Sequence, residues 1–452
     1  MADSDGKLLG VVILTRHGDR AGFYQDPDTY EATSTVITPL GTQQEIQLGR
    51  LLRSMYLNAS SPLNIATMND TIVDQTQIHV RADAGGELGV IYDSAVALLQ
   101  GLFPATANYF TDLANGTKIV GALEGYQSVE PTNDVSLEGY TSCGPFNDAT
   151  TAFYNSSEFM QMKNASAAFL SMLPQFLDGR PADLENMASH LSDCIYDFMN
   201  VQSIHNEQFA KALPPTFLAQ ALTLASWHEY GVFTSPQLDG IGNIAGRTIL
   251  PGILSELASI ANASDPLKLA YQSLAYKPFL SLFNMTGVAQ ANPQLAGLVN
   301  YAAAVTLEVR QPTAGGEPVV RFNFKNGTGE DFVQYQLIGS TGDVPISALA
   351  DHVNSALINS TSQWCTACNN TQDRGCGAIA QAAAQASAAV LAANGGHHQR
   401  ISPVGAGFLG AGLTLVVVLG MFGVLAFLGL LTIGRGKRAG STHSKTNSDE
   451  KP

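Results

Sequence analysis

Five consecutive residues, Arg16-His17-Gly18-Asp19-Arg20, have side chains whose types and spacing could do chemistry together. Two guanidinium groups beside one imidazole repel each other and lose hydration, so a purely structural role is unfavourable. The same groups suit a dianion, because each arginine fork can hold two phosphate oxygens at once. Gly18 lets the backbone turn tightly and approach a ligand. The pentapeptide therefore predicts a phosphate-binding loop.

The stretch that precedes this loop is expected to position it. Leu9 and the run from Val11 to Leu14 are apolar, which is typical of a strand buried on both faces inside a parallel sheet. The run is too short to span a membrane. Ligands of open α/β sheets bind where the strands end, so this strand would deliver the loop to a binding site at the sheet edge.

The loop and the segment after it resemble a known family. Arg16–Arg20 following a strand is similar to the catalytic motif of the histidine acid phosphatases, a branch of the phosphoglycerate mutase-like histidine phosphatase superfamily. The resemblance implies an α/β fold, with a central, mostly parallel sheet flanked by helices and an inserted, mainly helical cap lobe at about 105–235. The similarity continues where the family has its next helix, at Thr38-Pro39-Leu40-Gly41, Gln44, Leu48-Gly49, Leu52-Arg53 and Tyr56.

The resemblance also implies a reaction and the residues that perform it. His17 would attack the phosphorus atom and form a phosphohistidine, which water then hydrolyses. Arg16, Arg20 and Arg81 would bind the phosphoryl oxygens, because Arg81 follows a predicted strand at 72–80, where the family carries its third phosphate-binding arginine. No metal ion or organic cofactor is implied.

The sequence departs from the family where the proton donor is expected. The family's strand ends in His-Asp, whose histidine binds phosphate and whose aspartate protonates the leaving group, but an ungapped comparison puts Ala275 and Tyr276 at these two positions. A positioned general acid is worth roughly 10²–10⁴ in rate. Tyr276 or Lys277 could supply the proton, and His228 or Glu229 in the cap are further candidates. Four other histidines are interpreted as surface or structural residues: His79, His190, His205 and His352.

Two hypotheses from different classes follow. The first is a membrane-anchored, glycosylated phosphomonoesterase with an altered proton donor. The second is a pseudophosphatase that binds phosphorylated ligands or partner proteins through the arginine pocket. The intact His17 favours the enzyme, since a pure binding module needs no nucleophile, whereas the missing His-Asp pair favours the binding module.

Composition limits the class of protein and its compartment. A chain of 452 residues has room for a large core and two lobes. The net charge of −15 argues against nucleic acid as a partner. Because only 13% of the residues are charged, N-linked glycans are expected to help keep the protein soluble. The sequence has ten Asn-x-Ser/Thr sequons, at Asn58, Asn69, Asn115, Asn155, Asn164, Asn262, Asn284, Asn326, Asn359 and Asn369.

Cysteine usage agrees with an oxidising compartment. Cys143 and Cys194 stand apart, while Cys365, Cys368 and Cys376 form a cluster. The Cys-x-x-Cys pair lacks the second cysteine or histidine pair that a zinc site needs, so no metal site is predicted. Disulfide bonds are expected, with one thiol left over and the connectivity open.

The C-terminal part carries a predicted membrane anchor. Residues 404–433 form an uncharged apolar stretch that is long enough to cross a bilayer with some tilt. Basic residues follow at 435–438, so the tail is expected in the cytoplasm and the bulk outside or in a lumen, as in a single-pass membrane protein. Met1–Lys7 contains no signal peptide. Either the true start lies upstream or the protein is tail-anchored and cytosolic, and the sequons favour the first.

These interpretations give the predicted organisation of the chain. The domains are 1–395, phosphatase-like; 396–403, linker; 404–433, transmembrane helix; and 434–452, cytoplasmic tail. Further strands are expected at 267–274, 303–310, 318–324 and 331–337, with Asn326-Gly327 as a hairpin signal between the last two. Helices are expected at 38–56, 90–102, 159–176, 183–201, 215–230, 246–261 and, as an alanine-rich stalk, 378–393.

Overall fold

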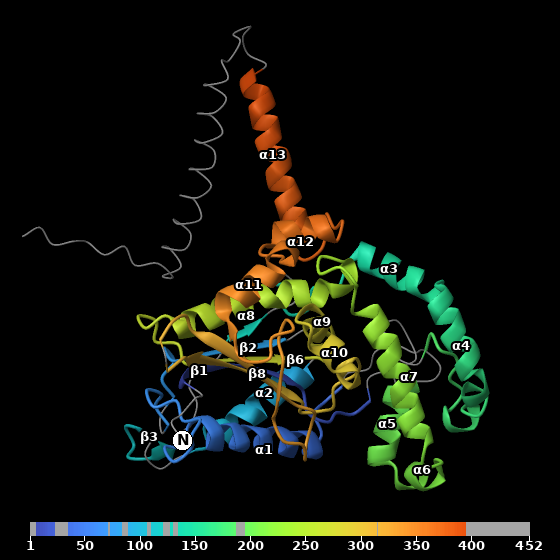
Figure 1. Cartoon of the computed structure of the whole chain (residues 1–452), viewed down its shortest axis with the longest axis horizontal. Coiled ribbons are helices and arrows are strands. Elements are labelled where there is room, and N and C mark those ends of the chain that lie inside the picture. The colour runs from blue at the N-terminus through green and yellow to red at the C-terminus, as the bar shows by residue number, and fades with distance from the viewer. Residues whose placement is uncertain are drawn as a thin grey trace, which may run out of the picture. The chain divides into compact units, whose positions relative to one another are not determined.

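The computed structural model describes residues 6–22, 35–70, 73–83, 89–105, 110–120, 127–129, 134–186, 195–313 and 315–394. The chain divides into two compact units, Met1–Ala382 and Ala383–Pro452, and the predicted site lies in the first. Within its described part, the first unit contains a central sheet with helices on both faces, which confirms the α/β class (Figure 1).

The central sheet is mixed, which corrects the prediction of a mostly parallel sheet. Its described strands follow the order β10-β8-β7-β1-β6-β2-β5, with β9 paired to β8. β1, β6, β2 and β5 are parallel, whereas β7, β8, β9 and β10 pair antiparallel. The antiparallel half arises because short connections join these later strands, as the predicted hairpin at Asn326-Gly327 does between β8 and β9. The strands are β1 (Lys7–Arg16), β2 (Ile78–Asp83), β5 (Gln127–Val129), β6 (Leu269–Leu274), β7 (Ala304–Gln311), β8 (Val319–Lys325), β9 (Val333–Tyr335) and β10 (Val344–Pro345).

Strand β1 lies inside the sheet and is buried on both faces, as its apolar run predicts. Val11 and Ile13 point to one face and pack with α1 (Pro39–Tyr56) and α2 (Gly89–Leu102). Val12 and Leu14 point to the other and pack with α8 (Ile244–Ala261) and α9 (Lys277–Met285). Two hydrophobic layers therefore hold the strand whose end carries the predicted loop.

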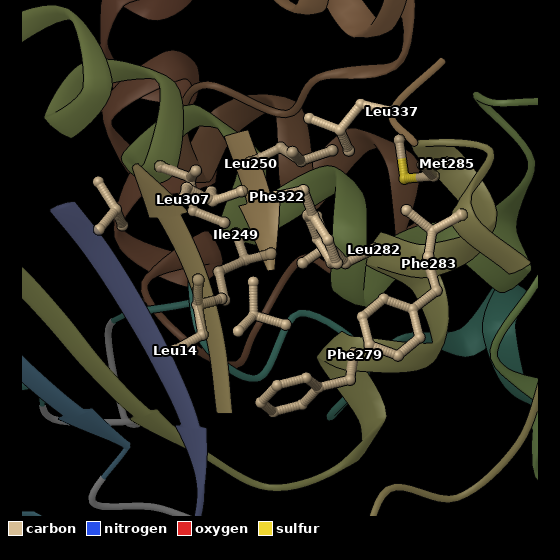
Figure 2. Packing of buried hydrophobic residues seen from close by; sticks show 14 of the residues in the cluster. Leu14, Ile249, Leu250, Phe279, Leu282, Phe283, Met285, Leu307, Phe322 and Leu337 are labelled. Atoms are coloured by element: carbon tan, nitrogen blue, oxygen red, sulfur yellow. The ribbon is translucent and has the colours of Figure 1, made fainter. Parts of the chain in front are cut away.

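The core on the α8 and α9 face is rich in large side chains (Figure 2). Phe279 and Phe283 of α9 are almost fully buried, and Phe283 contacts Phe322 and Phe324 of β8 in edge-to-face geometry. Burying one such side chain contributes about 1.5–3 kcal/mol. This packing fixes α9 against the sheet, and α9 begins directly after Ala275 and Tyr276, where the family's His-Asp pair is expected.

The helices at 144–232 form a second packed group with its own hydrophobic cluster, in which Phe159, Leu173 and Ile195 are fully buried. These helices fall within the range given for the predicted helical cap, about 105–235, and the cap itself stays a prediction. The helix expected at 183–201 is described only from Ile195, because 187–194 lie outside the described residues. The helices are α3 (Gly144–Tyr154), α4 (Ser157–Leu170), α5 (Ile195–His205), α6 (Glu207–Ala212) and α7 (Phe217–Val232).

The remaining elements are short, apart from one. Helix α13 (Cys376–Asn394) confirms the alanine-rich helix, while its role as a stalk stays a prediction. The predicted strand at 72–80 is found later, as β2 at Ile78–Asp83. The other described elements are β3 (Phe110–Asp112), β4 (Lys118–Val120), α10 (Val288–Ala291), α11 (Ile346–Val353), α12 (Thr361–Ala367) and the 3₁₀ turns at Pro174–Phe176, Ile241–Asn243, Pro293–Leu295 and Asn354–Ala356.

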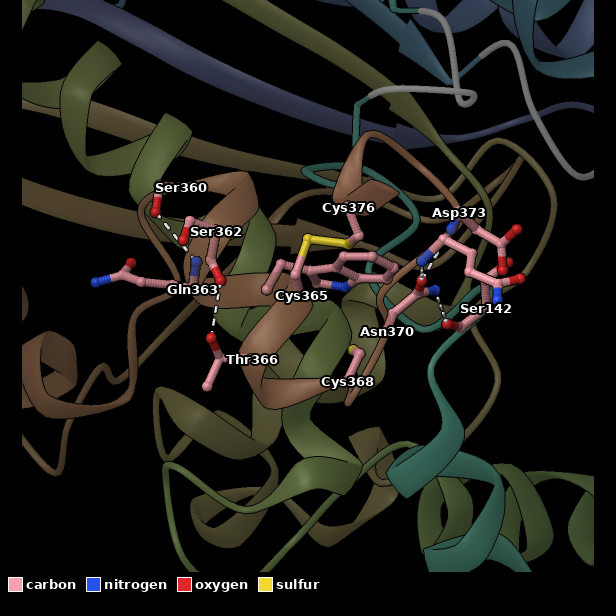
Figure 3. The surroundings of a disulfide bond; sticks show 12 residues. Ser142, Ser360, Ser362, Gln363, Cys365, Thr366, Cys368, Asn370, Asp373 and Cys376 are labelled. Carbon is pink, nitrogen blue, oxygen red and sulfur yellow. Dashed lines mark hydrogen bonds between the residues drawn. A yellow bond between two sulfur atoms is a disulfide. The ribbon is translucent and has the colours of Figure 1, made fainter. Parts of the chain in front are cut away.

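Two disulfides cross-link the C-terminal cysteine cluster. The bond between Cys143 and Cys368 joins the cluster to the residue before α3, and the bond between Cys365 and Cys376 lies within the cluster (Figure 3). Asn370, between them, donates from its side chain to the Ser142 carbonyl oxygen at 2.8 Å. The cluster is therefore a cross-linked structural element, as the reading of these cysteines as disulfides predicts, and Cys194 lies outside the described residues.

The predicted transmembrane helix at 404–433 lies outside the described residues. Within the described part, one helical stretch, Ile241–Ala261, is long and apolar enough to cross a membrane. This stretch is largely α8, whose Ile249, Ile253 and Leu257 are buried in the core against the sheet.

Candidate active site

The loop Arg16–Arg20 lies at the carboxyl end of the parallel strands. Arg16 pairs with Leu274 in the β1–β6 register, and the His17 amide donates to the Leu274 carbonyl oxygen at 3.1 Å. The next amide, Gly18 N–H, donates to Ser94 Oγ of α2 at 3.0 Å. A Cβ on Gly18 would lie 2.6 Å from the Gly41 carbonyl oxygen, so this close approach to α1 requires glycine. The loop is thereby fixed between β6, α1 and α2.

His17 is fully buried and held in one tautomer. Its Nδ1 lies 2.8 Å from the Gly18 carbonyl oxygen, and because a carbonyl can only accept, Nδ1 carries the proton. The other ring nitrogen, Nε2, then holds the lone pair. A neutral imidazole oriented in this way is suited to attack an electrophile through Nε2.

Arg16 lies between two aromatic rings and the backbone. Its Nη1 donates to the Val299 carbonyl oxygen at 2.5 Å. Its guanidinium carbon lies 4.4 Å from the ring centroid of Tyr301 and 5.3 Å from that of Tyr276. These contacts fix the direction of the guanidinium group beside His17, whose ring centroid is 5.5 Å from that of Tyr301.

Helix α5 of the cap contacts the loop through two acid–base pairs. Arg20 Nη2 and Nη1 lie 3.0 and 3.2 Å from the two carboxylate oxygens of Asp197, and both side chains are nearly buried. His205 Nε2 lies 2.9 Å from Asp19 Oδ2, which also accepts from Thr38 Oγ1. A protein carboxylate therefore occupies the fork of Arg20 that the sequence assigns to phosphate.

The two candidate proton donors lie at the start of α9, on the side of the site next to Arg16. Tyr276 Oη donates to Glu229 Oε2 at 2.6 Å, and Lys277 Nζ lies 5.5 Å from the Tyr276 ring centroid. Glu229 is fully buried, and its Oε1 lies 3.0 Å from Nδ1 of His228. His228 Nε2 in turn lies 3.0 Å from the Tyr154 hydroxyl. The structure thus joins Tyr276 and both cap candidates in one buried chain of hydrogen bonds.

Arg81 lies apart from this group. In the sheet, Arg81 pairs with Gln272 of β6. Gln272 in turn pairs with Leu14 of β1, three residues before His17. Its guanidinium group donates to Ser136 Oγ and lies 3.5 Å from Asp134 Oδ2. Among the described residues, no hydrogen bond or ion pair joins it to Arg16, His17 or Arg20. Its part in phosphate binding stays a prediction.

Arg81 also lines a cavity of about 290 Å³. The walls of this cavity come from the loop before α3, from α8 and from the segment that leads into α12, at Asp134–Ser136, Thr248, Pro251, Gly252 and 358–361.

The sequence did not predict that three further residues contact the site. Asp197 and His205 lie 177 and 186 positions from their partners, and His205 was interpreted as a surface or structural residue. Tyr301 lies just before the strand expected at 303–310, and no pattern in the sequence marks it as a site residue. The orientation of a ring toward His17 leaves no local sequence signal.

Within the part of the chain that the structure describes, no group of three or more histidine, cysteine or carboxylate side chains is arranged to hold a metal ion. The groups beside His17 include the ring of Tyr301 and the guanidinium group of Arg16, which suits an anionic ligand.

Comparisons with known proteins bear on the family and on the fold. No family model matches the chain. The chain is similar to testicular acid phosphatase of Homo sapiens, with 22% identity over 368 residues that cover 76% of this chain and 78% of that protein. Its fold is similar to that of Klebsiella sp. ASR1 phytase, with a TM-score of 0.54, 13% identity and coverage of 78% of this chain and 97% of that chain. Hafnia alvei phytase in complex with tartrate gives a TM-score of 0.54, 14% identity and coverage of 80% and 98%.

Proposed function

Because the chain is related to the histidine acid phosphatases in sequence and in fold, we propose that it hydrolyses phosphomonoesters through a phosphohistidine on His17. The observation that carries the proposal is the hydrogen bond from His17 Nδ1 to the Gly18 carbonyl oxygen, at 2.8 Å. This bond places the ring proton on Nδ1, so that in the neutral imidazole Nε2 carries the lone pair that attacks, in a loop that presents Arg16 and Arg20 on either side.

The reaction has two steps on this nitrogen. Nε2 forms a bond to phosphorus while the bond from phosphorus to the ester oxygen breaks, and water then attacks the phosphohistidine and releases inorganic phosphate. Arg16 and Arg20 stabilise the charge on the phosphoryl oxygens, with Arg81 as the third arginine. For Arg20 to stabilise this charge, the phosphate must displace the Asp197 carboxylate or bind the Arg20 guanidinium group together with it.

Tyr276 is the proton donor for the leaving oxygen. Its ring lies beside Arg16, at 5.3 Å, and its hydroxyl is bonded to the buried Glu229. The phenol gives its proton to the ester oxygen, and the phenolate regains a proton from the water that hydrolyses the phosphohistidine. Glu229, which is itself linked to His228, accepts from the phenol and orients it. Lys277 is the weaker candidate, because the described contacts of its ammonium group are with the faces of the Tyr140 and Tyr276 rings.

The test compares an aryl and an alkyl phosphate. Nitrophenolate leaves without a proton, so nitrophenyl phosphate should be cleaved by the wild type and by Tyr276→Phe, but not by His17→Ala. An alkyl phosphate needs the acid, so Tyr276→Phe should lose about 10²–10⁴-fold on it. Equal losses on both esters would remove Tyr276 as the donor, and Lys277→Ala is then the variant to measure. Cleavage of the aryl ester by His17→Ala would refute the phosphohistidine.

A second function is supported by one observation, the ion pair between Arg20 and Asp197. If phosphate binds without displacing Asp197, Arg20 cannot stabilise the phosphoryl group during transfer, and the loop binds phosphorylated ligands without cleaving them. Correctly folded protein that binds phosphate but leaves even the aryl ester intact would establish this alternative.

The proposed location is a membrane, with the catalytic unit outside the cell or in a lumen, glycosylated and anchored through 404–433. Support comes from the two disulfides, which persist in oxidising compartments, and from exposed sequons such as Asn58 and Asn262. Protein expressed with a signal peptide should lose mass on endoglycosidase treatment. Unmodified cytosolic protein made from the native transcript would refute the location.

A further inference from the structure

Tyr301 is held against the catalytic loop by the backbone on both sides. The Ala302 amide donates to the His17 carbonyl oxygen at 3.1 Å, and the Arg16 amide donates to the Ala303 carbonyl oxygen at 2.9 Å. Ala302 has a φ of 53°, a left-handed conformation that is uncommon for a residue with a side chain. The chain therefore accepts a strained turn directly after Tyr301, just before β7 begins.

The ring of Tyr301 is fixed between two groups of the loop. Its centroid lies 4.4 Å from the guanidinium carbon of Arg16 and 5.5 Å from the ring centroid of His17. A cation over an aromatic face contributes about 0.5–2 kcal/mol, the larger value where water is excluded. A phenylalanine would make both of these contacts, so they do not explain the hydroxyl group.

The hydroxyl of Tyr301 is buried and has no hydrogen-bond partner among the described residues. Leaving such a group unpaired costs about 1–3 kcal/mol, and buried polar groups in proteins are normally paired. Arg16 Nε, on the neighbouring side chain, is also buried without a partner. Two donors beside His17 therefore have no hydrogen-bond partner among the described residues.

The charges around the hydroxyl determine what it can bind. The groups that act on the phenol are Arg20, Asp197, Arg16 and Asp19, and burial raises the pKa of Tyr301 above its ordinary value. The phenol therefore stays protonated and is a hydrogen-bond donor at neutral pH. A neutral donor that lies near both Arg16 and Arg20 suits an oxygen atom that carries negative charge.

From this geometry we infer that Tyr301 Oη donates a hydrogen bond to a non-bridging oxygen of the phosphoryl group that is transferred to and from His17. The inference rests on the proposed phosphatase function and deepens it by adding a residue to the site. No proton is transferred in this contact. The sequence has Ala275 where the related enzymes are expected to have a phosphate-binding histidine, so β6 no longer supplies that donor, and the turn before β7 supplies one instead.

Tyr301→Phe tests the inference, because it removes only the hydroxyl. In the full-length protein, the variant should hydrolyse nitrophenyl phosphate with a kcat/KM about 10²-fold lower, the usual effect of losing one donor to a developing oxyanion. Its affinity for orthovanadate, measured by titration calorimetry, should fall at least tenfold. Its melting temperature without ligand should equal or exceed that of the wild type, since an unpaired buried hydroxyl is removed.

Tyr335→Phe is the matched control, since Tyr335 lies in β9 and packs on Phe324, and it should leave rate and affinity unchanged. Equal vanadate affinities of wild type and Tyr301→Phe, or no vanadate binding by either, would overturn the inference. Different results refute the proposed phosphatase function and the proposed contact of Tyr301. A wild type that binds vanadate but cleaves no aryl ester refutes the phosphatase, while a lower affinity in Tyr301→Phe still supports the contact.

Discussion

Replacing Asp197 by asparagine tests whether a cap carboxylate competes with phosphate for Arg20. The two ionic hydrogen bonds of this pair are 3.0 and 3.2 Å long, and the side chains are only 6% and 10% exposed, so solvent screens them little. In Asp197→Asn the amide oxygen still accepts from Arg20, but the charge and one acceptor are lost. Without ligand, the free energy of unfolding should fall by about 1.5–3 kcal/mol.

The effect on phosphate binding has the opposite sign. In the phosphate complex, phosphate oxygens supply the acceptors for Arg20, so the loss of the carboxylate no longer matters there. The variant should therefore bind phosphate more tightly by the energy that it lost, which is about 10- to 100-fold at 1.4 kcal/mol per factor of ten. Calorimetric titration with inorganic phosphate measures the affinity, and urea unfolding measures the stability.

Asp343→Asn is the matched control for this experiment. Asp343 forms a bidentate pair with Arg321 of β8, at 2.8 and 3.0 Å, outside the catalytic loop. The control should lose stability and keep the phosphate affinity of the wild type. Weaker or unchanged phosphate binding in Asp197→Asn would refute the reasoning and would mean that Asp197 positions Arg20 for phosphate and does not compete with it.

Two further predictions concern buried polar groups. Burial raises the pKa of Glu45 well above its ordinary value of 4.5, so above that pH the folded protein holds a proton that the unfolded chain has released. The free energy of unfolding should then fall as pH rises, by up to about 1.4 kcal/mol per pH unit, until the pKa of Glu45 in the folded protein is reached. Urea unfolding between pH 4.5 and 7 should show this fall in the wild type but not in Glu45→Gln. An equal dependence of the unfolding free energy on pH in both proteins would contradict it. The Asn284 amide donates to the Ser235 carbonyl oxygen and to Asn243 Oδ1, at 2.8 and 2.9 Å. Peptide mapping of the folded protein should therefore find a glycan at Asn58 but none at Asn284, and a glycopeptide at Asn284 would contradict this.

Local patterns in the sequence predicted the elements that carry the loop. The apolar run of β1 indicates burial on both faces because each of its residues needs a dry environment. Thr38 followed by Pro39 indicates the start of α1, where Thr38 caps the helix by accepting from the Gly41 amide. These signals are short-range, so they can be read from a single sequence.

The direction of the later strands could not be read in the same way. The pattern of β7 predicts a strand, but a strand at the centre of a sheet has the same apolar residues whether it runs parallel or antiparallel to its neighbour. The turn at Ala302 and the backbone pairing of β7 with β1 set that direction. The hairpin signal at Asn326-Gly327 indicated only the antiparallel pair of β8 and β9.

The contacts within the site depend on packing between distant segments. The pairs of α5 with the loop and of Tyr276 with Glu229 join residues far apart in the chain. The packing of the cap helices brings α5 and α7 to these places, and no spacing rule in the sequence encodes it. Sequence reasoning could therefore name Glu229 as a candidate donor, but not choose between it and Tyr276.

In the proposed mechanism, two tyrosines perform the two tasks of the family's His-Asp pair. An acid for the leaving group and a donor for the phosphoryl oxygens need not come from one dipeptide, because each depends only on where its polar hydrogen lies relative to the ester. Tyr276 directly precedes α9 and Tyr301 precedes β7, and both rings pack on Arg16, at 5.3 and 4.4 Å. Arg16 thus holds both rings, and in the proposed mechanism this one arginine keeps the acid and the oxyanion donor in register with the nucleophile.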